Sequence, residues 1–471
     1  MKYSDCARRT GLALVLAVLT ACASQPPDHG VEQAQAALLA RGLDTRVTQD
    51  KFRGTLSRQR AVQAAILNHP SVRAEYARLN IAAADVVRAS ELLNPSLSLS
   101  WLDVSGGSNE LTVGLAQSLA AVMLRPARRR IAAADYELAI LSLADTLQEL
   151  ALDTESAWFA LVAAEQELQV QTRASDTALW ADQLGTRFAS AGNITPLERA
   201  ELAKGAAEAR LALLEAERQR DRARILLDQQ LALPHEDWSV PGSLPLPATE
   251  QPDPETLIAR VLATHPALQA LAWERKRLLS VGDEAKTESW LDDAEIGVEH
   301  ERAGDERGTG PELAFRLPLW HRNAGTRLAL AAELELLAAR EAELRDQLPR
   351  QLRMQLAELA RLRTAVQIRE QDLLPALADE VGARQERVNF MLDGIFNLLA
   401  SKQSELNAWR DHIATLAEYW QQEVELAGTV GRAATPAGDG LLDVSIIAPR
   451  KRSTPDPEPQ PQHHHQHGGH H

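Results

Sequence analysis

Residues 294–301 read Ala-Glu-Ile-Gly-Val-Glu-His-Glu, so apolar and polar side chains alternate along this stretch. Three further stretches alternate in the same way: residues 96–104, 110–116 and 312–317. A period of two predicts β-strands with one apolar and one polar face, as in a membrane β-barrel. Four strands are too few for a barrel, which needs about eight. Because an open sheet edge does not occur in lipid, we expect several copies of the chain to complete one barrel.

Five glutamates fall on the predicted polar faces of these strands, where a barrel would enclose water. They are Glu110, Glu295, Glu299, Glu301 and Glu312. Carboxylates along a channel favour the passage of cations. Any water-filled lumen also needs polar residues, so the sequence leaves open whether these glutamates select ions or only keep the lumen wet.

Each pair of predicted strands is followed by a very long helical stretch. The first covers residues 126–189, about 95 Å at 1.5 Å per residue, and returns to residue 233 after a turn at 191–196. The second covers residues 324–430 with a turn at 392–395, and Pro349 predicts a kink or cap within it. Leucines recur at spacings of three and four with alanines between them. This pattern predicts a coiled-coil-like helical shaft and a mainly α fold with a small β part.

The sequence repeats itself after roughly 200 residues, which makes each half one structural unit. His69-Pro70 and His265-Pro266 occupy matching places, and each predicts a helix end because proline disfavours helix at the preceding residue. The predicted segments are a lipoprotein signal peptide (1–21), a lipidated linker (22–50), a first repeat (51–233), a proline-rich linker (234–254), a second repeat (255–432) and a disordered Pro- and His-rich tail (433–471).

The composition argues against several functional classes. The chain has 471 residues, a net charge of −15 and only 4% aromatic residues, which is typical of long helices rather than of a bulky globular core. An acidic chain without a basic stretch is not expected to bind nucleic acid. We find no GxSxG, P-loop, CxxC or zinc-protease motif, and therefore expect neither an enzyme nor a cofactor.

The N-terminus has the pattern of a secretory signal. Basic residues at positions 2, 8 and 9 precede an apolar run at 11–19 that is too short for a membrane helix. The following Leu-Thr-Ala-Cys resembles a bacterial lipobox, which implies cleavage before Cys22 and a lipid on its thiol. An ordinary signal peptide with an incidental cysteine is the alternative. Ala23 and Ser24 directly follow Cys22, and the absence of an aspartate at these positions favours the outer membrane.

The C-terminal tail carries the only residues with evident metal chemistry. Neutral imidazoles bind Cu²⁺, Ni²⁺ and Zn²⁺, so the tail predicts metal capture, with a functionless end or a cloning tag as alternatives. Its histidines are His463, His464, His465, His467, His470 and His471. His300 and His321 lie near the second strand pair, but no neighbouring motif supplies further ligands.

Residues 317–325, Leu-Pro-Leu-Trp-His-Arg-Asn-Ala-Gly, carry the strongest resemblance to a known family. With residues 114–119, the two His-Pro segments and the helical turns at 187–197 and 387–398, they resemble the outer-membrane factors, the TolC-like channels of tripartite efflux pumps. The similarity covers about residues 50–430 and is greatest to the lipoprotein, heavy-metal branch. It implies a homotrimer with a twelve-stranded β-barrel in the outer membrane and a helical barrel across the periplasm. A periplasmic adaptor protein and an inner-membrane pump are the implied partners.

The same resemblance implies a passive exit duct, with heavy-metal cations such as copper as the expected cargo. A drug efflux duct and a structural coiled-coil envelope lipoprotein without channel activity remain as alternatives. Members of the family often carry constricting aspartates in the second helical hairpin. Here Asn397 and Ala400 occupy the plausible equivalents, and Asp393 is the candidate constriction residue. A solvated helix cap is the alternative for Asp393.

Overall fold

Two halves of the chain follow the same order of elements: two helices, two strands, a long helix and a returning helix. The first half consists of α3 (Arg58–Asn68), α4 (Pro70–Ser90), β2 (Ser96–Leu102), β3 (Glu110–Ser118), α5 (Leu119–Ser190) and α6 (Pro196–Leu231). The second consists of α7 (Pro254–Thr264), α8 (Pro266–Leu291), β5 (Glu295–Ala303), β6 (Glu306–Ala314), α9 (Ala324–Ile368), the π-helical turn η1 (Arg369–Leu373), α10 (Leu374–Asn389) and α11 (Ile395–Val430).

The structure is a computed structural model, and it describes residues 54–103, 109–233, 238–247, 253–291, 294–316 and 323–431. The predicted signal peptide, the lipidation site at Cys22, His321 and the six histidines of the tail lie outside these residues. Two short parallel strands, β1 (Gly54–Thr55) and β4 (Trp238–Ser239), join the start of the described chain to the segment between the halves.

Both His-Pro pairs form the junction between the two short helices of their half. The ring Nδ1 of His69 accepts a hydrogen bond from the backbone N–H of Ser71 at 3.3 Å. The Nδ1 of His265 accepts one from the N–H of Ala267 at 3.2 Å. Each histidine thus ends one helix and caps the next, and their predicted role at helix ends is confirmed.

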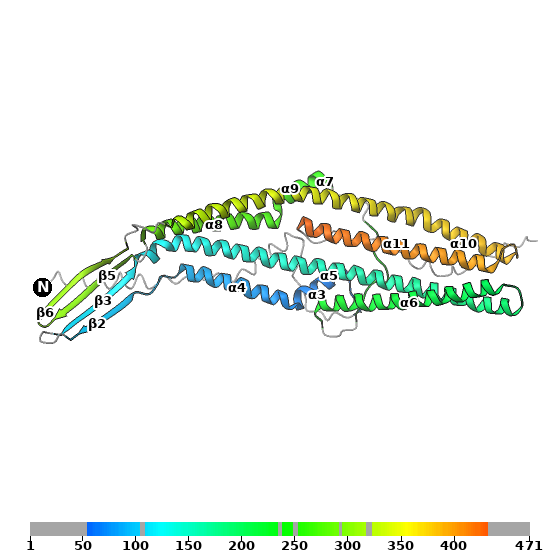
Figure 1. Cartoon of the computed structure of the whole chain (residues 1–471), viewed down its shortest axis with the longest axis horizontal. Helices are drawn as coiled ribbons and strands as arrows, with labels where there is room; N and C mark the ends of the chain where they lie inside the picture. The colour runs from blue at the N-terminus through cyan, green and yellow to red at the C-terminus, as the bar shows by residue number, and fades with distance from the viewer. Residues whose placement is uncertain are drawn as a thin grey trace, which may run out of the picture.

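The helices form a long shaft with the sheet at one end and the two helical turns at the other (Figure 1). α5 has 72 residues, or about 108 Å at 1.5 Å per residue, and packs against α4, α6, α8 and α11. The predicted start at residue 126 is wrong, because the hydroxyl of Ser118 caps the N–H of Ala121 at 3.1 Å. The helix therefore begins at Leu119 and continues through Pro126, as α9 continues through Pro349.

The largest apolar core lies where the two halves meet. The rings of Phe159 on α5 and Trp420 on α11 stack with their centroids 4.8 Å apart. The Trp420 indole N–H donates to the carbonyl of Pro245 at 2.8 Å, and the Trp158 indole donates to the carbonyl of Leu56 at 2.9 Å. These bonds fasten the irregular segments of the chain to the helices, so the core fixes both halves as one shaft.

The four long strands form one antiparallel sheet in the order β2-β3-β5-β6. Three strands match the predicted ranges 96–104, 110–116 and 294–301 to within one or two residues at each end. The predicted fourth strand at 312–317 is wrong, because β6 begins at Glu306 and ends at Ala314. Gly304 has a φ of +62°. This left-handed conformation allows a tight turn where a longer loop was expected.

Candidate functional site

The register of the sheet separates its side chains into an apolar and an acidic face, because directly paired residues of neighbouring strands point to the same side. The apolar face carries Leu97, Leu99, Trp101, Leu111, Val113, Leu115, Ile296, Val298, Pro311 and Leu313. The opposite face brings together all five predicted glutamates, Glu110, Glu295, Glu299, Glu301 and Glu312. It also carries Glu306, which the sequence analysis missed because the alternation in β6 is interrupted by glycines.

Small residues show toward which face the sheet bends. A Cβ on Gly297 would lie 2.8 Å from the carbonyl oxygen of Leu115 and 3.1 Å from the Cβ of Ala116. Gly297 lies on the acidic face with Gly114, where an added Cβ would meet the Ser98 hydroxyl. Side chains crowd on the inside of a curved sheet, where glycine permits the close approach. We infer that the acidic face is concave and the apolar face convex.

Within the described residues, the outer edges of β2 and β6 pair with no strand. The apolar side chains beside them are open to solvent in the single chain: Leu97 is 73% and Leu313 is 62% exposed. An apolar convex face suits lipid, but unpaired backbone N–H and C=O groups do not. In lipid, such a sheet would need strands from elsewhere to pair its two edges.

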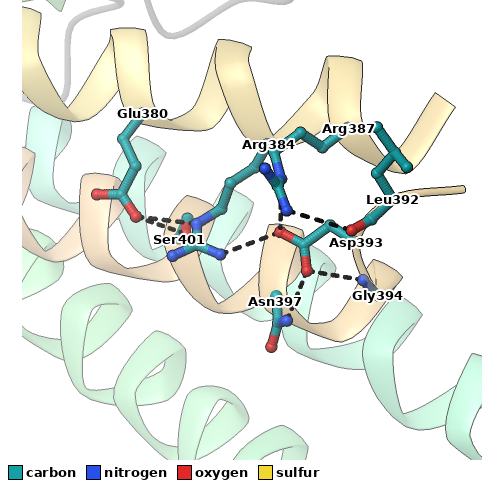
Figure 2. A network of polar contacts seen from close by, with 8 residues as sticks. All are labelled: Glu380, Arg384, Arg387, Leu392, Asp393, Gly394, Asn397 and Ser401. Atoms are coloured by element: carbon teal, nitrogen blue, oxygen red, sulfur yellow. Dashed lines mark hydrogen bonds and ion pairs between the residues drawn. The ribbon is translucent and has the colours of Figure 1, made fainter. Parts of the chain in front are cut away.

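At the other end of the shaft, Asp393 lies in the turn between α10 and α11 and binds residues on both sides of it (Figure 2). Its Oδ1 accepts from the backbone N–H of Gly394 at 2.8 Å and from the Asn397 amide at 2.7 Å. Its Oδ2 lies 3.3 Å from the guanidinium of Arg384 and 3.9 Å from that of Arg387. The carboxylate therefore closes the turn by joining the two helices.

These contacts distinguish Asp393 from a solvated helix cap. The N-cap of α11 is Gly394, and the side chain of Asp393 is only 13% exposed. The Asn397 amide, the Gly394 N–H and the two arginines all favour the ionised form, so they hold the pKa of Asp393 below its usual range. The side chain of Asp393 is thus held between two helices rather than solvated at the cap position, and its constriction role stays a prediction.

Two further contacts extend this cluster along the hairpin, as Figure 2 shows. The Arg384 Nε donates to Glu380 at 3.0 Å, and the Ser401 hydroxyl donates to the same carboxylate oxygen at 3.1 Å. Of the two positions expected to correspond to the family aspartates, Asn397 contacts Asp393 directly. Ala400 instead lines a groove between α5, α6 and α11.

The turns at this end also expose apolar side chains, which the sequence analysis did not single out. Phe390 is 76%, Met391 93% and Leu392 67% exposed, and Met391 has a φ of +56°. The two hairpins meet through Phe188 and Phe396, whose ring centroids are 5.5 Å apart. The sequence does contain a sign of this tip, because three consecutive apolar residues immediately precede the aspartate of the turn. The two hairpins thus end together in an exposed apolar tip.

Neither a membrane-spanning helix nor a metal site is found in the described parts of the chain. No helix there combines the length and apolar character needed to cross a bilayer. Within the same residues, no three His, Cys, Asp or Glu side chains are grouped to hold a metal ion. The Nδ1 of His300 lies 2.7 Å from the Thr309 hydroxyl.

Comparison with known proteins identifies the fold. No protein-family model and no curated protein sequence matches the chain. Among solved structures, the chain is similar to the Neisseria gonorrhoeae MtrE outer-membrane channel in its open state, with a TM-score of 0.64 and 15% identity over 83% of this chain and 94% of MtrE. It is also similar to CusC, which forms a transmembrane channel, with a TM-score of 0.61 and 11% identity over 83% of this chain and 96% of CusC. The similarity to the Vibrio cholerae outer-membrane protein VceC has a TM-score of 0.61 and 14% identity over 80% of this chain and 96% of VceC.

The chain therefore has the TolC-like fold of these outer-membrane channels, and the predicted resemblance is confirmed at the level of the fold. Each match spans at least 80% of this chain.

Proposed function

We propose that the protein is the outer-membrane duct of a tripartite efflux system and acts as a passive exit path, not as an enzyme. The observation that carries this proposal is the sheet, which has an apolar convex face, an acidic concave face and two unpaired edges at the end of a helical shaft. Such a sheet suits lipid outside and water inside only after closure.

Three copies would close the sheet if β2 of one copy pairs with β6 of the next. Three sheets of four strands make twelve, enough for a barrel with an aqueous lumen. The shaft supports the same assembly, because its helices expose large apolar side chains. These include Leu211, Leu214 and Ile225 on α6 and Leu328 and Leu336 on α9. Burial between neighbouring copies would remove this surface from water.

The far end of the shaft would face the inner membrane and dock a periplasmic adaptor and pump. Its exposed tip of Phe390, Met391 and Leu392 fits that role, because solvent-exposed apolar clusters mark protein contacts. The cargo we propose is heavy-metal cations, supported by the acidic concave face and by the histidine-rich tail. Lipidation of Cys22 would anchor the mature chain in the outer membrane.

Cysteine cross-linking tests the closure directly. Cysteines replace Ser96, Ser98 or Ser100 on β2, each combined with a cysteine for Gly308 or Gly310 on β6. Oxidation of at least one pair in the membrane should give covalent dimers and trimers on denaturing gels. The control pair Thr112→Cys with Gly310→Cys should give none, because β2 would lie between β3 of one copy and β6 of its neighbour, and β5 separates β3 from β6 within one sheet.

Planar-bilayer recording of the purified trimer then separates a duct from a structural lipoprotein. We expect stepwise ion conductance from the detergent-extracted trimer. A monodisperse monomer without conductance or cross-links would overturn the proposal and favour the structural coiled-coil lipoprotein. For the cargo, a deletion strain should become sensitive to copper. Removing residues 455–471 should weaken copper tolerance only modestly, because the duct does not need the tail.

A further inference from the structure

The sheet separates not only polar from apolar side chains but also negative from positive charge. All six glutamates of the strands lie on the concave face. The three basic residues of the strands, His300, Arg302 and Arg307, lie on the convex face with the apolar side chains. This segregation follows from strict alternation in β5, where Glu299, Glu301 and Ala303 point to one side and His300 and Arg302 to the other.

The two arginines form a directly opposed pair. Arg302 of β5 faces Arg307 of β6 across the ladder, and both side chains are exposed. Like charges in this position repel each other. Arg302 donates to the backbone carbonyl of Gly304 at 3.3 Å. Within the described residues, neither arginine has a carboxylate within ion-pair distance. The pair is thus a concentration of positive charge that an anion would stabilise.

The position of the pair along the strands suggests what that anion is. Trp101, Leu111, Arg302 and Arg307 form one row across the sheet, at the end away from the helices (Figure 1). The row lies about 20 Å along β5 from Ile296 at roughly 3.4 Å per residue, close to the apolar band of about 25 Å in membrane barrels. A tryptophan with basic residues at the edge of such a band is typical of the lipid headgroup region.

We propose that Arg302 and Arg307 bind phosphate groups of anionic lipids in the outer leaflet of the outer membrane. This inference rests on the proposed function, because it requires the convex face to meet lipid. Guanidinium groups bind phosphate oxygens through paired charge-assisted hydrogen bonds. One phosphate between the two arginines would neutralise their repulsion, and the apolar side chains of the same face would meet the acyl chains. The adjoining His300 and Thr309 complete a polar rim at this level.

Lipid-dependent thermal stability of the trimer provides the test. The full-length mature protein in detergent is titrated with diphosphoryl lipid A, with the same lipid after dephosphorylation, or with inorganic phosphate. A ligand that binds only the folded trimer raises its dissociation temperature. We expect a rise with diphosphoryl lipid A alone. Arg302→Gln with Arg307→Gln should weaken the apparent lipid affinity about tenfold or more, since hydrogen bonds to charged groups are the stronger class.

A matched control removes the same charge elsewhere. Arg78→Gln with Arg88→Gln on α4 should keep the lipid response of the wild type, because these arginines pair with carboxylates on their own helix. An equal response to dephosphorylated lipid, or to inorganic phosphate, would overturn the proposal. So would a lower dissociation temperature of the arginine variant without any lipid effect, which would indicate a protein partner such as Asp103 of a neighbouring copy. Bilayer conductance is recorded for every variant, so a conducting trimer without a lipid response refutes this inference and leaves the proposed function standing.

Discussion

His412 illustrates at the residue scale how burial controls ionisation in the shaft. Its side chain is fully buried on α11, and neither ring nitrogen has a hydrogen-bond partner among the described residues. Burial, with the positive charge of Arg369 nearby, lowers the pKa of His412 from 6.5 to about 4. The folded protein therefore holds a neutral imidazole at neutral pH. An unfolded chain takes up a proton at this position as the pH falls below 6.5.

This difference predicts how stability changes with pH. Because the unfolded state binds the extra proton, the contribution is present above pH 6.5 and is lost progressively as the pH falls to about 4. The full loss is about 3 kcal/mol. His412→Met should make thermal unfolding less sensitive to pH in this range and should not destabilise at pH 7, since no hydrogen bond is lost. Leu416→Met on the same helix should keep the wild-type pH profile. An unchanged profile for His412→Met would contradict the prediction.

Asp393 gives a second prediction at this scale. Its contribution to stability also falls as the pH falls, but here the cause is the loss of contacts to its carboxylate rather than burial. Its contacts favour the carboxylate and lower its pKa, so the stability that it contributes is present above its ordinary pKa near 3.9 and is lost as the pH falls through the lower folded value. Asp393→Asn should remove the ion pairs to Arg384 and Arg387 and loosen the turn at neutral pH. Hydrogen exchange of residues 390–397 should become severalfold faster.

The control for Asp393 lies on α11, the helix that follows the turn. Asp411 is partly exposed, and its carboxylate pairs with its sequence neighbour Arg410, so it joins no two elements. Asp411→Asn should leave exchange in the turn unchanged. If both variants exchange at the wild-type rate, the carboxylate of Asp393 does not hold the hairpin closed.

At the scale of elements, the curvature of the sheet depends on where glycine replaces a larger side chain. Gly297→Ala places a methyl group against the backbone of β3, which has to move. We expect a loss of about 1–3 kcal/mol, typical of overpacking, and a lower dissociation temperature of the trimer. Gly114→Ala is the control on the same face, because its new methyl meets the Ser98 hydroxyl, which rotates away. Equal effects of the two variants would contradict a bend that depends on Gly297.

Strand β6 is the element whose extent was predicted wrongly from the sequence. Its residues Gly308, Gly310 and Pro311 have low strand propensity, so the pattern predicted a loop where the structure has a strand. Pairing with β5 supplies the hydrogen bonds that local preference does not. The π-helical turn η1 between α9 and α10 was likewise missed, because its sequence Arg-Glu-Gln-Asp-Leu is an ordinary helical one.

At the scale of the whole molecule, the separation of charge by face determines what the lumen would favour. Glu295→Gln, Glu299→Gln and Glu301→Gln together remove three carboxylates per copy from the concave face. We expect the reversal potential in a salt gradient to shift toward weaker cation selectivity, because less negative charge concentrates cations at the mouth. Glu255→Gln on α7, where the carboxylate pairs with Arg353, should leave selectivity unchanged. Unaltered selectivity in the triple variant would mean that the glutamates only keep the lumen wet.

Periodicity alone determined the elements of this protein: three of the four strands, the long helices, the turns between them and the glutamates of one face all follow from side-chain spacing. These features are local, since a period of two or of three to four is set by backbone geometry. Tertiary structure decided the rest. The full extent of β6, the contacts of Asp393 and the opposition of Arg302 to Arg307 depend on which residues pair across space. Pairing between strands and across a helical turn brings together residues whose spacing in the sequence carries no sign of their contact.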